Sequence, residues 1–182
     1  MKTIFFIFLL ILSAGYAHGQ EIIHLNIDSI AEAQSKHLIT EKKAEQVLIY
    51  ESGCLGCEFL REVDCNCEDS GSDIYLIWAE GGKYFTKRIG CCIEDVVKEF
   101  SNPTLFKEIL SNKSKIFGSQ FKTEYEEIHH GFEKLTLVSA DRKQEIYIED
   151  FLFAKDNKYR EHNLKQPAKV YTDKLSKEFK KK

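Results

Sequence analysis

The stretch DIYLIWAEGGKYFTKRIG, residues 73–90, predicts a β-hairpin that organises the rest of the chain. Two runs rich in β-branched and aromatic residues, 74–79 and 84–89, flank Gly81 and Gly82, which accept the positive φ angles of a tight two-residue turn. Side chains of a strand alternate between two faces, and both faces of 74–79 are apolar. We therefore expect 74–79 to be a central strand and 84–89 to lie nearer the edge of the sheet.

Two further patterns predict the rest of this sheet. Residues 132–139 and 144–153 carry alternating apolar side chains around the polar turn 140–143, so they predict a second hairpin. The continuous apolar run 47–50 predicts a buried strand upstream of the first hairpin. Because hairpins pair their strands antiparallel, the sheet is expected to be mostly antiparallel.

Helices are expected near the N-terminus and in the middle of the chain. Apolar residues recur at helical spacing over roughly 29–45, behind an N-cap at Asp28 or Ser29, and they predict one helix or a helix broken near Thr40. Asn102 and Pro103 predict the start of a helix over 104–112, since a proline at the first helical position loses no hydrogen bond. The predicted fold class is therefore α+β: a mostly antiparallel sheet built from two hairpins and packed by N-terminal and central helices.

Two segments leave alternatives open. Residues 93–100 are expected to form a short amphipathic helix or a turn. Residues 169–175 are expected to add an edge strand or to begin a terminal helix that runs through Lys182. Short apolar runs fit both periodicities, so the pattern alone does not choose.

The first residues, 1–19, predict a secretory signal peptide. Lys2 precedes an unbroken apolar run, 4–12, which reaches only about half of the hydrocarbon thickness of a bilayer. Small residues follow, and cleavage is expected between Gly19 and Gln20. The protein is therefore expected to be exported to the periplasm or the cell exterior, without a transmembrane segment in the mature chain.

The mature chain is expected to hold one globular α+β domain, residues 20–160, followed by a basic C-terminal extension, 161–182. About 163 of the 182 residues remain after the signal peptide, enough for one hydrophobic core. Their net charge is −4, divided between +6 for residues 155–182 and −10 for residues 20–154. A basic bias of this size is weak support for nucleic-acid binding in an exported protein, so no such partner is expected.

The six cysteines all lie within residues 54–92. They are Cys54, Cys57, Cys65, Cys67, Cys91 and Cys92. Export would place them in an oxidising compartment, where disulfides persist. The acidic stretch 51–73 has little apolar surface to bury, so a cysteine-stapled loop is expected, with cross-links worth about 2–4 kcal/mol each. Adjacent Cys91 and Cys92 are expected to bond different partners; whether Cys54 pairs locally with Cys57 stays open.

The spacing Cys54-x-x-Cys57 after a predicted strand also resembles a thioredoxin-type redox motif. Such a motif needs a thiolate whose pKa is lowered by a following helix. Here Glu51 and Glu58 would raise that pKa, and the short interval before Cys65 leaves no room for the long helix. A thiol–disulfide oxidoreductase using Cys54 and Cys57 is therefore the alternative, and structural disulfides are favoured.

Metal sites are weaker alternatives. Cys54 and Cys57 form half of a zinc knuckle, but neither of the other two cysteine pairs repeats this spacing, and oxidation competes with zinc binding. The acidic residues 64–73 do not match the EF-hand pattern, which leaves an irregular cation site or a solvated loop. His129 and His130 precede a glycine and are expected to form a polar turn. No cofactor is expected.

Several motifs resemble exported bacterial proteins of unknown function over roughly residues 47–178. They are Tyr75-Leu76-Ile77-Trp78, Gly82-Lys83-Tyr84, the second hairpin and Lys169–Leu175. The resemblance implies no particular activity. The sequence therefore predicts an exported, disulfide-stabilised binding or interaction domain without a recognisable catalytic site, rather than an enzyme. Its partner, a protein or a small molecule, and its oligomeric state are left open.

Overall fold

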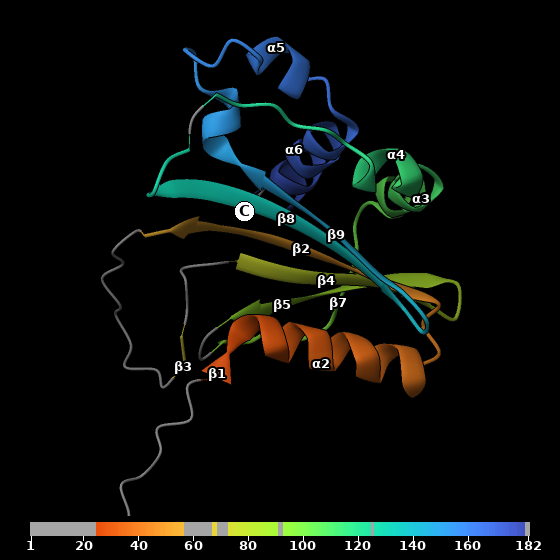
Figure 1. Cartoon of the computed structure of the whole chain (residues 1–182). Coiled ribbons are helices and arrows are strands. Elements are labelled where there is room, and N and C mark those ends of the chain that lie inside the picture. The colour runs from red at the N-terminus through yellow and green to blue at the C-terminus, as the bar shows by residue number, and fades with distance from the viewer. Residues whose placement is uncertain (1–24, 57–66, 69–72, 91–92, 125, 181–182) are drawn as a thin grey trace, which may run out of the picture.

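The computed structural model describes residues 25–56, 67–68, 73–90, 93–124 and 126–180. They form an α+β fold in which an antiparallel sheet lies between two layers of helices (Figure 1). The strand order is β6-β5-β4-β2-β8-β9, and β7 pairs with β5. The predicted α+β class is thus confirmed.

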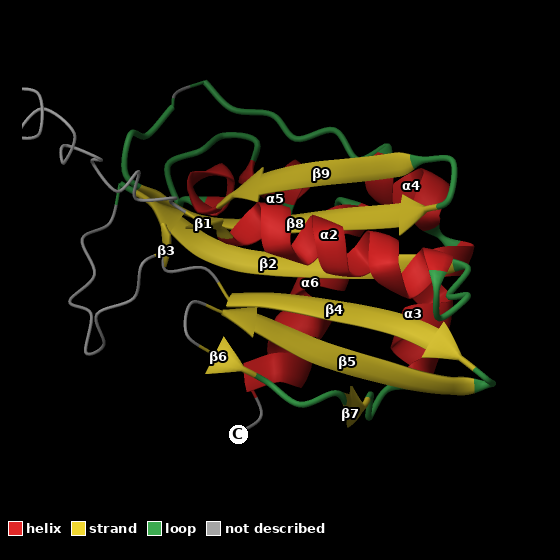
Figure 2. Cartoon of the chain, turned by 90° about the horizontal axis from the view of Figure 1, so that it is seen from below, coloured by secondary structure: helices red, strands yellow, loops and turns green. Residues whose placement is uncertain are grey.

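One central strand joins the two predicted hairpins into a single sheet. The strands are β2 (Gln46–Leu55), β4 (Asp73–Glu80), β5 (Lys83–Gly90), β6 (Ile93–Glu94), β7 (Lys98–Glu99), β8 (His130–Ser139) and β9 (Lys143–Glu149). β2 pairs antiparallel with β4 on one side and with β8 on the other (Figure 2). A separate parallel pair is formed by β1 (Leu25–Asn26) and β3 (Cys67–Glu68).

Helices cover both faces of the sheet. One face carries α2 (Ile27–Thr40). The opposite face carries α3 (Pro103–Ser111), α4 (Lys113–Phe117) and α6 (Pro167–Lys180). The 3-10 turn η1 (Asp150–Phe153) and α5 (Arg160–Asn163) lead from β9 back to α6. Among the described residues no helix is long and apolar enough to cross a membrane.

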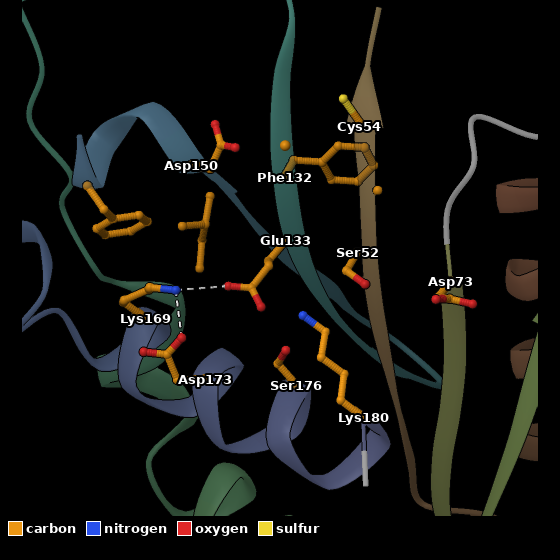
Figure 3. A pocket seen from close by; sticks show the side chains of 14 residues that line it. Ser52, Cys54, Asp73, Phe132, Glu133, Asp150, Lys169, Asp173, Ser176 and Lys180 are labelled. Atoms are coloured by element: carbon orange, nitrogen blue, oxygen red, sulfur yellow. Dashed lines mark hydrogen bonds and ion pairs between the residues drawn. The ribbon is translucent and has the colours of Figure 1, made fainter. Parts of the chain in front are cut away.

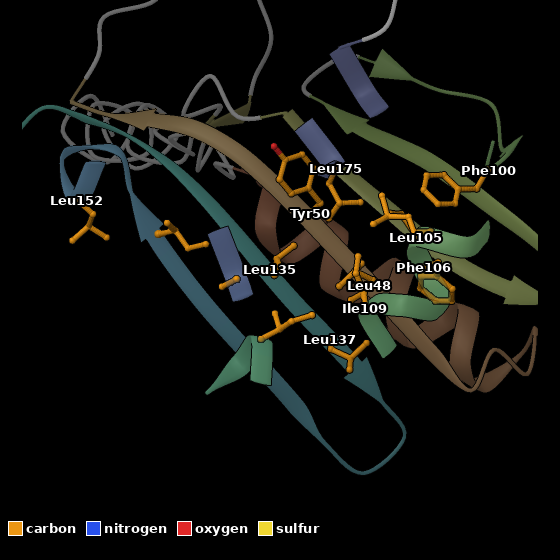
Figure 4. Packing of buried hydrophobic residues seen from close by; sticks show 14 of the residues in the cluster. Leu48, Tyr50, Phe100, Leu105, Phe106, Ile109, Leu135, Leu137, Leu152 and Leu175 are labelled. Carbon is orange, nitrogen blue, oxygen red and sulfur yellow. The ribbon is translucent and has the colours of Figure 1, made fainter. Parts of the chain in front are cut away.

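Alternation along β2 divides the hydrophobic core into two clusters. Val47 and Ile49 belong to the cluster under α2, whereas Leu48 and Tyr50 belong to the larger cluster under α3, α4 and α6 (Figure 4). All four are buried, and full burial of an aliphatic side chain of this size stabilises by roughly 1.5–3 kcal/mol. A strand with two apolar faces must lie inside a sheet that is covered on both sides.

The predicted first hairpin is confirmed in detail. Glu80 pairs with Lys83 across the turn, and Gly81 and Gly82 have φ angles of 58° and 79°. A side chain at either position would strain the backbone. β4 lies between β5 and β2, as a central strand should, and beyond β5 the described residues form only the two-residue strands β6 and β7.

The central helix also begins where the sequence predicts. The side chain of Asn102 accepts a hydrogen bond from the Leu105 amide at 3.1 Å, and Pro103 occupies the first turn. The N-terminal helix α2 ends at Thr40, where the sequence indicated a break.

Residues 93–100 are neither a helix nor a simple turn, contrary to expectation. β6 and β7 instead pair with two different parts of β5: Glu94 of β6 pairs with Ile89, and Glu99 of β7 pairs with Phe85. The outer edge of β5 offers unpaired amide and carbonyl groups, and pairing with them outweighs the weak helical pattern.

The C-terminal segment is a helix, which settles the alternative left open for residues 169–175. Ala168, Thr172 and Leu175 of α6 are buried, two of them in the larger core cluster. Their spacing of four and then three residues places them on one helical face.

Candidate functional site

A cavity of about 500 Å³ lies between α6 and the sheet (Figure 3). This volume falls within the range of small-molecule sites. The end of β2, the beginning of β8 and η1 also contribute to its wall. Polar and charged side chains dominate this wall, unlike the apolar cluster next to it on the same face of the sheet.

The floor of the cavity is one row of residues that crosses four strands. Asp73 pairs with Ser52, Ser52 with Glu133, and Glu133 with Ile148. The neighbouring row on the same face pairs Tyr75, Tyr50, Leu135 and Ile146, and it belongs to the core. On β4, β2 and β8 the change from an apolar to a polar residue marks where the core ends and the cavity begins, whereas Ile148 of β9 still belongs to the core.

The roof of the cavity is one stripe of α6. Its residues are Lys169, Asp173, Ser176 and Lys180. Their spacing of four, three and four residues keeps them on the same side of the helix, beside the apolar stripe that anchors α6 to the core. The same helix therefore both closes the core and supplies charged groups to the cavity.

Lys169 is fixed between two carboxylates. Its Nζ donates to Asp173 Oδ1 at 2.6 Å and to Glu133 Oε2 at 3.3 Å, and it lies 4.7 Å from the centre of the Phe153 ring. Burial lowers the pKa of Lys169, but Asp173 and Glu133 outweigh it, so the pKa is raised. Lys169 therefore stays a cation at neutral pH.

Glu133 is held from a second direction by Tyr50. The Tyr50 hydroxyl donates to Glu133 Oε1 at 2.9 Å. Burial, followed by the charge of Glu133, raises the pKa of Tyr50 well above its usual value, so the hydroxyl remains a donor. With Lys169 on its other oxygen, the Glu133 carboxylate has both oxygens occupied and its orientation fixed.

Two charged residues of the wall have no such partner. Within the described part of the chain, Asp150 and Lys180 take part in no ion pair or side-chain hydrogen bond. A Cβ atom added to Gly131 would meet Asp150 Oδ2 at 2.6 Å, so the carboxylate lies directly over this glycine. Asp73, by contrast, is paired with Arg88.

Of the six cysteines predicted to form disulfides, only Cys54 has a side chain that the structure describes. It is in β2, lines the cavity and is disulfide-bonded. Cys57, Cys65, Cys91 and Cys92 lie outside the described residues, and Cys67 is described only as part of β3. The cysteine-stapled loop and its pairing therefore stay predictions.

The two histidines do not form the polar turn expected of them. His130 is the first residue of β8 and is buried, with its ring edge-on to Phe151. His129 is exposed, and its Nδ1 lies 2.8 Å from the Gly56 carbonyl. Pairing of β2 as far as Leu55 extends β8 backwards into this position, which the local sequence does not reveal.

The predicted acidic cation site lies mostly outside the described residues, and its last member, Asp73, is in β4. Among the residues described, no group of three or more histidine, cysteine or acidic side chains could hold a metal ion. The wall residues Glu133, Lys169 and Asp173 were not predicted as site residues. Their only signal in the sequence is a charged residue at an inward strand position and the polar spacing along 169–180.

Comparison of the chain with protein families, curated proteins and solved structures finds no match.

Proposed function

We propose that this protein is an exported, disulfide-stabilised binding domain that holds a small polar ligand in the cavity under α6. The observation that carries this proposal is the fixed set Glu133, Lys169 and Asp173 in the wall of a cavity of ligand size, with Glu133 held from the core side by Tyr50. Charged groups that are oriented before a ligand arrives lose little freedom on binding, so they favour affinity and selectivity.

Binding is favoured over catalysis by the protonation state of these groups. A general base needs a pKa near the working pH, whereas the pKa of Lys169 is raised further above neutrality. A lysine held as a cation between two carboxylates shapes the wall of a binding site and is poorly suited to accept a proton from a ligand.

The proposal is tested by protein-observed NMR on the mature chain, titrated to millimolar concentrations with the standard amino acids, linear amines and linear carboxylates. At least one class is expected to shift amide signals of β2, β8 and α6 around the cavity. Ser176→Phe places a large ring in the cavity and should abolish these shifts, whereas Lys177→Phe, on the exposed side of the same helix, should not.

Shifts that persist in Ser176→Phe, or the absence of shifts with every probe, would contradict the proposed binding site. If Ser176→Phe does not fold, Ser52→Leu fills the cavity from the sheet side and serves the same purpose.

A thiol–disulfide oxidoreductase is the second candidate, because Cys54 lies at the wall of the cavity. In that case the disulfide of Cys54 would be reduced by mild dithiol reagents, and the released thiol would react rapidly near neutral pH. A disulfide that resists such reagents would remove this candidate.

A further inference from the structure

The charged groups of the cavity differ in whether they already have partners. Lys169 is shared by Glu133 and Asp173, and Asp73 is paired with Arg88. These groups are held within the protein and define the shape of the wall. Only Asp150 and Lys180 face the cavity without an ion-pair partner among the described residues.

The two unpartnered charges lie at opposite ends of the cavity. Figure 3 shows Asp150 at one end, beside η1, and Lys180 at the other, on the last turn of α6. Glu133 lies between them, and Ser52 and Ser176 lie beside the end of the Lys180 side chain. The cavity therefore presents an unpaired anion beside η1 and an unpaired cation beside the end of α6, with the internally paired Glu133 between them.

The side of the cavity formed by β9 and η1 is partly apolar. Ile148 is buried in β9, and Phe153 closes η1 with its ring under the Lys169 ammonium. Methylene groups of a ligand can lie against these two side chains while its ends meet the charges. Apolar walls with a few placed polar groups are the usual composition of a small-molecule site.

We propose that the ligand is a dipolar small molecule whose ammonium group meets Asp150 and whose carboxylate meets Lys180, in the manner of an amino acid or a very short peptide. This inference rests on the proposed function and adds the chemical class of the ligand. A ligand with both charges compensates both unpaired groups, whereas a simple amine or carboxylate compensates one.

Three probes of matched length test this pairing: δ-aminovalerate, which carries both charges, n-pentylamine, which carries only the ammonium, and valerate, which carries only the carboxylate. Affinities are measured by NMR titration of the mature chain. We expect δ-aminovalerate to bind about tenfold more tightly than either single-charge probe, since a partly exposed ion pair contributes a factor of several to binding.

Neutral variants assign each end. Asp150→Asn should weaken the binding of δ-aminovalerate and n-pentylamine about threefold to tenfold and leave the affinity for valerate unchanged. Lys180→Gln should weaken the binding of δ-aminovalerate and valerate and leave the affinity for n-pentylamine unchanged. Glu126→Gln and Lys177→Gln remove exposed charges away from the cavity wall and serve as matched controls that should change nothing.

The outcomes separate the two proposals. If all three probes bind in the cavity with equal affinity, or if the two variants weaken every probe alike, the dipolar ligand is excluded while the binding cavity stands. If none of the three probes shifts the cavity signals but another probe does so, the ligand class is again wrong. If no probe of any kind shifts them, both proposals fall.

Discussion

Tyr147 and Phe132 stack across β8 and β9, with ring centroids 5.0 Å apart and an interplanar angle of 23°. Tyr147 pairs with Lys134 across the two strands, beside the ion pair between Lys134 and Glu51 at 3.2 Å. Glu51 is almost fully buried there, at 4% exposure. A phenol in this position must ionise next to buried carboxylate charge.

Burial, then the charges of Glu149 and Glu51, raise the pKa of Tyr147 from 10.0 to about 12. The folded state therefore keeps this proton at a pH where the unfolded chain has lost it. The contribution of Tyr147 to the free energy of unfolding is fully present below pH 10 and is lost as the pH rises from 10 towards 12. We expect Tyr147→Phe to lessen this loss and to remove a late-titrating component from the phenolate absorbance curve.

Both readouts are taken on the same sample, as denaturant unfolding and absorbance at matched pH values. An identical loss of stability with pH in the two proteins would show that Tyr147 does not carry a raised pKa.

At the scale of elements, α6 has the largest influence on both core and site. Phe179 stacks on Tyr75 with ring centroids 3.8 Å apart and on Tyr50 with centroids 5.9 Å apart. Tyr50 in turn donates to Glu133 in the cavity floor. The aromatic stack thus sets the distance between the sheet and the helix that forms the roof of the cavity.

Phe179→Ala should therefore destabilise the protein by about 2–4 kcal/mol, because a large aromatic contact is lost and the space is only partly refilled. Lys177→Ala, on the exposed side of α6, should change stability by less than about 0.5 kcal/mol. Urea unfolding compares the two variants. Equal midpoints would mean that α6 does not contribute to the core as described.

The hairpin pairing of β8 with β9 and the insertion of β2 between two hairpins decide the shape of the whole molecule. The two edges of the sheet differ: one ends in the seven-residue strand β9, and the other in the two-residue strands β6 and β7. Short strands limit the length of exposed edge that could pair with another chain.

The disulfide of Cys54 gives the prediction for the whole molecule, because it joins the end of β2 to another cysteine within residues 57–92. We expect chain recovered from an oxidising compartment to contain no free thiol, and its bridges to be mapped by mass spectrometry of peptides. Full reduction should lower the free energy of unfolding by about 2–4 kcal/mol for each loop-closing bridge. Two or more free thiols per molecule, or bound zinc, would contradict a fully disulfide-stapled loop.

By itself the sequence determined the elements whose signals are local. The hairpin at 73–90 follows from two glycines between apolar runs, and the start of α3 follows from Asn102 and Pro103, because turns and caps depend on neighbouring residues. The antiparallel α+β class follows from the same short-range signals. Local pattern was insufficient for 93–100, where pairing with β5 decided the structure.

Only the tertiary structure decided the site. Ser52 and Glu133 meet because β2 and β8 pair in one particular register, and Lys169 joins them because α6 packs across that pair. Strand register and helix docking are set by burial of the whole core, and no short window of the chain contains them. The cavity exists because polar residues of the sheet face the charged stripe of α6, next to the place where apolar residues of the sheet face its apolar stripe.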